Sequence, residues 1–265
     1  MTVFKIILIV LLAILAAALA LILFLFVDAL IRMTLRSPRS IYNKRAAEAD
    51  FCPFDRIPDR FINMILISED DDFRRHKGIQ IKAIHSAIRI NLKYKRIVVG
   101  GSTITQQLAK NLYLRFDRSV LRKIVEMILA IGMEHSLSKD EILELYVNVV
   151  YYGCGCYGLS AASAYYFDKK PEGLTVNQMF ILVRILNAPT ANNPLRNPEN
   201  YIISRDRRIR DWLKPFRHGL TQEEAALIGS YPAEVIDPEL RKATDEYTRF
   251  AVVPLRNESY GPHTG

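Results

Sequence analysis

Three short segments of the sequence hold the residue types that acid–base and phosphate chemistry require. An acidic segment begins at Glu69, a glycine-serine-threonine turn follows at residues 100–103, and a basic segment ends at Glu126. A pair of carboxylates can move protons on a substrate, whereas fixed cations and a small polar turn favour an anionic group. The order of these segments therefore indicates chemistry on a sugar that is joined to a phosphate.

Glu69 follows the apolar run Phe61–Ile67, so we expect its carboxylate to stand beside apolar side chains. A carboxylate in such surroundings suits a general acid or base. If the segment continues as a helix, its spacing places Glu69, Phe73 and His76 on one face. The alternative is a solvated acidic helix end in which His76 only forms structural hydrogen bonds.

The turn Gly100–Thr103 stands before a segment whose apolar residues repeat with helical spacing. Backbone N–H groups at a helix start bind phosphate where small residues let it approach. The Gly-Lys-Ser/Thr ending of a nucleotide-binding P-loop is absent. Alternatively, a hydroxyl of the turn simply caps the helix. Further along, Gln107 and Asn111, with Lys110 beside them, either line a cleft or face solvent.

Arg122 and Glu126 are spaced as neighbours on a helix. This spacing alone predicts a surface ion pair worth about 0.3–0.5 kcal/mol. The other interpretation places the pair in a cleft, where Arg122 and Lys123 meet a leaving phosphate.

Taken in order, the segments resemble the peptidoglycan glycosyltransferases of family 51, the lipid II polymerases. The resemblance covers roughly residues 55–210 and rests on Glu69, Asp70, Phe73, His76 and Gly78, on Gly100–Gln107 with Lys110 and Asn111, on Arg122, Lys123 and Glu126, and on Lys139–Asn148. The loops Tyr151–Gly158 and Pro189–Pro198 also look like family segments. Cys154 and Cys156 depart from the Asn and Ala expected there, and Val149 departs from an Arg.

The resemblance implies a mainly α, lysozyme-like glycosyltransferase domain. It implies polymerisation of lipid II into β-1,4 glycan strands, with inversion and release of undecaprenyl pyrophosphate. Glu69 is expected to act as the base and Glu126 as the second catalytic carboxylate, with Lys110, Arg122 and Lys123 at the pyrophosphate. The remaining substrate-binding residues that it implies are Asp70, Phe73, His76, Gly101, Ser102, Thr103, Gln106, Gln107, Asn111, Glu144 and Asn148.

The same resemblance shapes the expected cofactors and partners. No metal ligand is assigned among the residues, and a divalent cation, Mg²⁺ or Mn²⁺, is the only cofactor considered. The expected partners are lipid II, the lipid-linked glycan chain, the membrane and other cell-wall synthesis proteins. No Ser-x-x-Lys penicillin-binding domain follows in the sequence, so we expect the monofunctional form of the family.

Two functions of other classes stay open. A lysozyme-like lytic enzyme acting on peptidoglycan would also use a glutamate in a helical domain. It would not need the turn, Lys110 or the Arg122-Lys123 pair, because no pyrophosphate leaves. A catalytically inactive, membrane-anchored cell-wall scaffold is the second alternative, although it would not need Glu69 and Glu126.

The N-terminal segment predicts a membrane anchor. Residues Ile6–Val27 include no charged or polar side chain, and about 20 apolar residues span a bilayer. A cleaved signal peptide is the competing interpretation, but its apolar region is usually only about 7–15 residues long. We expect a single-pass protein of the cytoplasmic membrane with its catalytic domain on the periplasmic or extracytoplasmic side. The arginines that follow the span conflict with this orientation under the positive-inside rule.

The organisation of the remaining chain follows from its composition. We expect an anchor at 1–28, a juxtamembrane connector at 29–50, a helical glycosyltransferase domain at 51–230 and an irregular tail at 231–265. Capping boxes are predicted at Ser138, Thr175 and Thr221. The net charge of +8 favours an anionic lipid surface over nucleic acid, since no nucleic-acid motif is present. Three cysteines are expected to act as small apolar filler.

Overall fold

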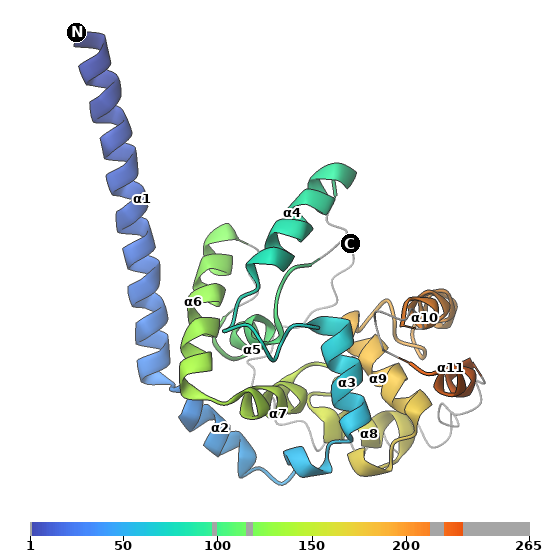
Figure 1. Ribbon diagram of the computed structural model, residues 1–265. Coiled ribbons are helices and arrows are strands. Elements are labelled where there is room, and N and C mark those ends of the chain that lie inside the picture. Colours follow the sequence, from blue (N-terminus) through green and yellow to red (C-terminus); the bar gives the residue numbers. More distant parts are fainter. Residues whose placement is uncertain (1, 97–99, 115–118, 213–219, 230–265) are drawn as a thin grey trace. The chain divides into compact units, whose positions relative to one another are not determined.

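The computed structural model describes residues 2–96, 100–114, 119–212 and 220–229, which form helices joined by loops (Figure 1). These residues contain no β-strand, and an isolated bridge joins Tyr151 to Tyr157. The mainly α fold is thus confirmed. The chain divides into two compact units: unit 1 comprises Met1–Ala49 and Glu69–Val147, and unit 2 comprises Asp50–Ser68 and Asn148–Gly265. The domain boundaries expected from the sequence stay predictions, and the expected tail at 231–265 lies outside the described residues.

Unit 1 holds most of the residues singled out above. Its helices are α1 (Thr2–Leu35), α2 (Pro38–Ala46), α4 (Ile81–Tyr94), α5 (Ile104–Tyr113), α6 (Val120–Ser136) and most of α7 (Lys139–Val149). The last residue of α3 (Asp59–Glu69) also belongs to it. Packing of α5 on α6 forms its centre, with Ile104, Leu108 and Leu129 fully buried.

The helix α1 is long and apolar enough to cross a membrane, and the side chains of its N-terminal part are exposed. Its C-terminal part instead packs on α6, where Leu25 and Ala29 are buried. Gly132 on α6 permits this approach, because an added Cβ would lie 2.4 Å from the Met33 side chain. One continuous helix therefore joins the predicted span to the core of unit 1.

The end of α1 is also tied to the last turn of α5. The guanidinium of Arg32 donates to the Tyr113 carbonyl at 3.1 Å, and Arg36 donates to the Leu112 carbonyl at 3.4 Å. Tyr113 donates its hydroxyl to the Arg36 carbonyl at 2.6 Å, and burial raises the pKa of Tyr113 to about 12. Cations at the carboxyl end of a helix also interact favourably with its dipole.

Unit 2 is built around α9 (Val176–Asn187), whose residues from Asn177 to Leu186 are all buried. Trp212 of α10 (Pro198–Trp212) meets Phe180 of α9 edge-on, with ring centroids 5.4 Å apart. Also in this unit are η1 (Phe54–Arg56), α8 (Leu159–Phe167), η2 (Pro171–Gly173) and α11 (Gln222–Gly229). Asn148 receives a hydrogen bond from the Cys52 N–H at 2.7 Å and donates to the Cys52 carbonyl at 2.8 Å.

Local sequence signals account for several helix starts. Reciprocal hydrogen bonds join Ser138 to Glu141, Thr175 to Gln178 and Thr221 to Glu224. The three predicted capping boxes are therefore confirmed. The three cysteines are free thiols, and Cys52 and Cys156 are buried.

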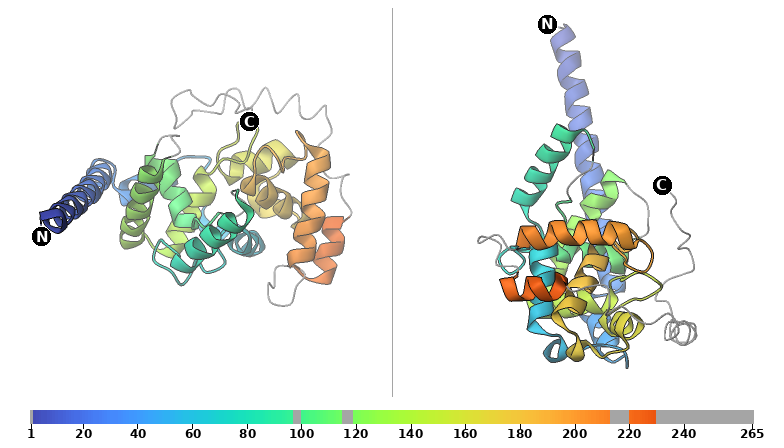
Figure 2. Two further views of the ribbon diagram at one scale, coloured as in Figure 1. Left: turned by 90° about the horizontal axis from the view of Figure 1, so that it is seen from above. Right: turned by 90° about the vertical axis from the view of Figure 1, so that its right-hand side faces the viewer.

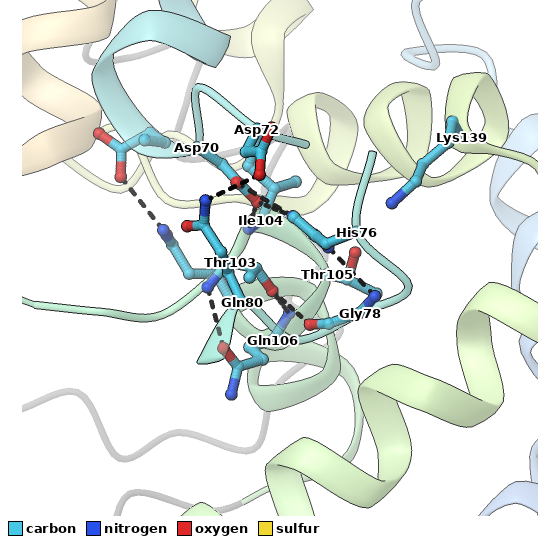
Figure 3. A network of polar contacts seen from close by, with 12 residues as sticks. Asp70, Asp72, His76, Gly78, Gln80, Thr103, Ile104, Thr105, Gln106 and Lys139 are labelled. Carbon is cyan, nitrogen blue, oxygen red and sulfur yellow. Dashed lines mark hydrogen bonds and ion pairs between the residues drawn. The ribbon is translucent and has the colours of Figure 1, made fainter. Parts of the chain in front are cut away.

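The segment after α3 does not continue as a helix, so the expectation that Glu69, Phe73 and His76 share a helix face is wrong. The helix ends at Glu69, and the side chain of Asp70 turns inward to bind distant groups. Its carboxylate accepts from His76 Nε2 at 2.9 and 3.0 Å and from the Ile104 N–H at 2.9 Å (Figure 3). These contacts replace local helical bonding.

Gly78 lets this segment lie directly on α6. Its backbone has φ +91°, and an added Cβ would come within 2.9 Å of the Ala130 backbone. Its N–H donates to His76 Nδ1 at 3.2 Å, and its carbonyl accepts from the Thr103 hydroxyl at 2.6 Å (Figure 3). Because His76 Nδ1 accepts, its Nε2 carries the proton that faces Asp70.

The Gly78 contact predicts a stability difference between two glycines of positive φ. Gly155 has φ +82° but no atom within 4 Å of an added Cβ, so Gly155→Ala tests backbone strain alone. Gly78→Ala adds a collision with the α6 backbone. We expect it to lower the free energy of unfolding by about 1–3 kcal/mol more than Gly155→Ala. Chemical denaturation of the two variants measures the difference, and equal losses would contradict the close packing.

The Asp70 contacts predict a large effect of an isosteric change. Asp70→Asn keeps the shape but turns an amide N–H₂ towards a donor on His76 or Ile104. The expected loss is about 2–3 kcal/mol of unfolding free energy. Asp71→Asn, at the exposed neighbouring position, is the control and should stay within about 0.5 kcal/mol of the unchanged protein. Similar midpoints for both variants would show that the Asp70 contacts do not support the fold.

Candidate active site

Glu69 lies at the carboxyl end of α3 and is half-buried. Its Oε2 accepts a hydrogen bond from Gln107 Nε2 of α5 at 3.1 Å. The Gln107 Oε1 in turn accepts from the Tyr146 hydroxyl of α7 at 3.0 Å. The Gln107 amide therefore orients the carboxylate of the predicted base, and the Tyr146 hydroxyl orients the amide. Such positioning suits a general acid–base residue.

The second predicted carboxylate, Glu126, is buried near the start of α6 and forms an ion pair with Lys123. The same Lys123 Nζ donates to the Ser102 hydroxyl at 2.6 Å. The expected ion pair between Arg122 and Glu126 is therefore wrong, because Lys123 one position later takes the carboxylate. Lys123 also joins α6 to the turn before α5.

Unlike Lys123, Arg122 forms no ion pair with Glu126. Its side chain is partly buried, and its Nε atom has no hydrogen-bond partner within the described part of the chain. A buried guanidinium N–H without a partner is costly in free energy. An incoming oxyanion could supply that partner.

Several polar groups at the start of α5 are bound within the protein. Thr103 caps α5: its hydroxyl accepts from the Gln106 N–H at 3.1 Å, and its own N–H donates to Gln106 Oε1 at 3.0 Å. The next N–H, of Ile104, binds Asp70. These bonds give Thr103 and Gln106 structural roles, and the expectation that the turn holds a phosphate stays a prediction.

Several other residues expected to bind substrate are buried in the fold instead. Phe73 is 1% exposed, and its ring lies 4.3 Å from Lys139 Nζ. The side chains of Asp70 and His76 are 1% and 6% exposed and bind each other. Glu144 accepts from the Tyr42 hydroxyl at 2.5 Å, and Asn148 binds the Cys52 backbone. These contacts give the five residues supporting roles in the fold, and their contact with a substrate stays a prediction.

The remaining predicted residues keep partial exposure. Ser102, Gln107, Lys110, Asn111, Arg122 and Lys123 are all neither fully buried nor fully exposed. Gly101 brings the turn close to α4, since an added Cβ would lie 3.0 Å from the Ala83 carbonyl oxygen. Unit 1 thus contains both predicted carboxylates, the Gln107 amide and several cations, which lie on α3, α5 and α6.

Sequence reasoning missed residues that connect these helices. Thr105 donates to Glu134 at 2.6 Å, and Lys139 donates to the same oxygen at 2.7 Å, which ties α5, α6 and α7 together. Tyr146 was also missed as a partner of Gln107. The available signal was weak: a tyrosine on an apolar helix face needs a partner for its hydroxyl, but the sequence does not say which.

The described residues contain no group of three or more His, Cys, Asp or Glu side chains that could hold a metal ion. Among the carboxylates of the site, Asp70 is bound by His76 and Ile104, and Glu126 by Lys123. This donor set does not fit a protein-held divalent cation, which prefers several oxygen ligands.

Comparison with known proteins identifies the domain. The sequence model of the family described as Transglycosylase matches residues 37–213. Penicillin-binding protein 1A of Pseudomonas aeruginosa is 42% identical over 160 residues, which are 60% of this chain and 19% of that protein. Penicillin-binding protein 4 of Bacillus subtilis is 41% identical over 201 residues, 76% of this chain and 29% of that protein.

A third relative, penicillin-binding protein 1A of Escherichia coli, is 40% identical over 152 residues, or 57% of this chain and 18% of that protein. The chain spans less than a third of the length of each of these three relatives. The family match nevertheless covers the segments that hold Glu69, the turn at residues 100–103 and Glu126. The chain therefore belongs to the transglycosylase family and carries the glycosyltransferase domain found in class A penicillin-binding proteins.

Proposed function

We propose that this chain is a peptidoglycan glycosyltransferase that polymerises lipid II into β-1,4 glycan strands and releases undecaprenyl pyrophosphate. One observation carries the proposal: the half-buried carboxylate of Glu69 is held by Gln107 in the unit that also presents Lys110 and Arg122. A carboxylate with fixed cations in the same site suits attack by a hydroxyl and departure of an anion.

The reaction is a single displacement. Glu69 takes the proton of the acceptor 4-hydroxyl while that oxygen forms a bond to the anomeric carbon of the donor. The bond from this carbon to the pyrophosphate oxygen breaks, and the electron pair leaves with the pyrophosphate. Attack from the opposite face converts the α-linkage of the donor into a β-linkage, so inversion needs no covalent enzyme intermediate.

The cations take unequal parts in this proposal. Arg122 has an unpartnered Nε and a planar guanidinium that can bind two phosphate oxygens, so it is the main ligand of the leaving pyrophosphate. Lys110, in the last turn of α5, adds a second positive charge. Lys123 holds Glu126 and Ser102 in place, and its contribution to the pyrophosphate is electrostatic.

A divalent cation is not needed for any step derived above. The carboxylates of Asp70 and Glu126 are engaged with protein groups, so in this proposal Mg²⁺ or Mn²⁺ would take its ligands mainly from the pyrophosphate itself. Retained polymerisation in the presence of a chelator would agree with this part of the proposal.

Tethering by α1 gives the reaction a physical advantage. Both substrates are lipid-linked in this proposal, and confinement of enzyme and substrate to one surface raises their effective concentration. The helix α4 stands out from unit 1 on the same side as the N-terminal part of α1 (Figures 1 and 2). It exposes Ile81, Ile88 and Leu92, which suits contact with lipid.

We place the domain on the extracytoplasmic side of the cytoplasmic membrane, where lipid II would be polymerised. The arginines after the span had argued against this orientation. Three of them are engaged by the protein: Arg32 by Asp28 and Tyr113, Arg36 by Leu112, and Arg39 by Glu141 and Ser136. Their presence thus has a structural reason besides membrane topology. Protease accessibility in intact spheroplasts tests the placement.

The proposal predicts that Glu69→Gln abolishes polymerisation of purified lipid II by the full chain. Removal of a general base costs at least about 10²-fold in rate. Glu172→Gln makes the same chemical change at an exposed position in unit 2 and should leave the rate unchanged. The readout is the initial rate of glycan formation in detergent.

Near-normal polymerisation by Glu69→Gln would refute the assignment of the base. The same preparations incubated with purified sacculi test the alternatives. Soluble fragments released by the unchanged protein, without polymerisation of lipid II, would indicate a lytic enzyme. Inactivity in both assays would leave the scaffold as the better description.

A further inference from the structure

Gln107 connects two side chains of unit 1, Glu69 at the end of α3 and Tyr146 on α7. Its Nε2 donates to Glu69 Oε2 at 3.1 Å, and its Oε1 accepts from the Tyr146 hydroxyl at 3.0 Å. The amide is therefore placed between a carboxylate, which only accepts when ionised, and a hydroxyl, which can both donate and accept. This difference between the two partners decides what the amide can do.

Burial restricts the position of the Tyr146 side chain. It is fully buried on α7, between the fully buried Leu145 and Val147. The start of α7 is fixed by the capping box of Ser138 and Glu141, and Glu144 accepts from the Tyr42 hydroxyl. Because the ring fills the core and the hydroxyl meets Gln107, the two contributions can be separated by a Tyr-to-Phe change.

The hydroxyl of Tyr146 selects the orientation of the Gln107 amide. With ionised Glu69, only the Nε2 end of the amide can face the carboxylate, because oxygen against oxygen is repulsive. The Oε1 end then points to Tyr146, whose O–H donates to it. Without this donor, the partly buried amide oxygen would lose its hydrogen bond, and the amide would be less firmly held.

The same hydroxyl also suits the protonated state of the base. Once Glu69 has taken the proton of the acceptor hydroxyl, its carboxyl group becomes a donor. The Gln107 amide can then turn over, so that Oε1 accepts from Glu69 and Nε2 donates to the Tyr146 oxygen. Every group keeps a hydrogen bond in both states, since the tyrosine hydroxyl exchanges the role of donor for that of acceptor.

We propose that Tyr146 is a positioning residue that acts through Gln107 to hold the Glu69 carboxylate in line for proton transfer. The inference rests on the proposed function, since it concerns the base of that reaction. It assigns a task to a residue that touches no substrate. It also explains why a fully buried tyrosine stands on the apolar face of α7.

A double-mutant cycle on the full chain tests the inference. The variants are Tyr146→Phe, Gln107→Ala and the double variant, assayed by polymerisation of purified lipid II. Tyr146→Phe should lower kcat on the order of 10-fold with KM within about twofold, because only the transition state loses an aligned base. In the Gln107→Ala background, the same change should cost less than about twofold, because the link to Glu69 is already cut.

Tyr166→Phe provides the matched control. Its hydroxyl is also buried and donates at 2.9 Å to the Tyr152 carbonyl, but it lies in unit 2. It should leave kcat within about twofold, and its effect should be the same with or without Gln107. Denaturation curves show whether each variant is folded at the assay temperature.

Three results would overturn the inference. They are an unchanged kcat in Tyr146→Phe, a change confined to KM, or equal costs of Tyr146→Phe with and without Gln107. Failure of the proposed function looks different, because Glu69→Gln would then stay active or the unchanged protein would not polymerise lipid II. Either outcome would remove the base on which the positioning role depends.

Discussion

The buried carboxylate of Asp70 is the constraint on which unit 1 depends. It accepts hydrogen bonds from His76 and from the first N–H of α5, and its side chain is 1% exposed. A buried charge is tolerated only when such partners replace water. Because Asp70 directly follows Glu69, the contact that fixes the start of α5 also fixes the end of α3. Gln107, one turn into α5, is thereby brought within hydrogen-bonding distance of the Glu69 carboxylate.

Contacts of α1 with α5 and α6 also link the apolar N-terminal helix to the candidate site. The C-terminal part of α1 packs on α6, and its arginines bind the last carbonyls of α5. These are the two helices that carry Gln107, Lys110, Arg122 and Lys123. The anchor is thus a part of unit 1, and the side chains proposed to bind the substrate stand on helices that the anchor itself contacts.

The sequence predicted what local spacing and motif order control. The helical class, the family, the apolar N-terminal helix and the capping boxes at Ser138, Thr175 and Thr221 are all confirmed. It could not predict the end of α3 at Glu69, because that end is caused by contacts between Asp70 and residues far along the chain. For the same reason, Asp70, His76 and Thr103 were expected to contact the substrate. In the structure, Asp70 accepts hydrogen bonds from His76 and the Ile104 N–H, and the Thr103 hydroxyl donates to the Gly78 carbonyl.

Spacing alone was also unable to choose between neighbouring cations. Both Arg122 and Lys123 can reach Glu126 from the preceding helical turn, and only the packing of α6 against the turn at Ser102 selects Lys123. Tyr146 illustrates the same limit, since the sequence does not show which group its hydroxyl binds. The pairing of side chains between helices could not be predicted from the sequence, because it depends on how α5, α6 and α7 pack.

Asp70 binds the first N–H of α5, so under the proposed function the leaving pyrophosphate would be bound by side chains and not by this N–H. The most direct measurement is amide hydrogen exchange and chemical shift of the Ile104 N–H, followed by NMR in detergent during titration with inorganic pyrophosphate. We expect a slowly exchanging Ile104 N–H whose chemical shift does not move, while the side-chain resonance of Arg122 does. A fast-exchanging Ile104 N–H, or one that moves with pyrophosphate while Arg122 does not, would contradict it.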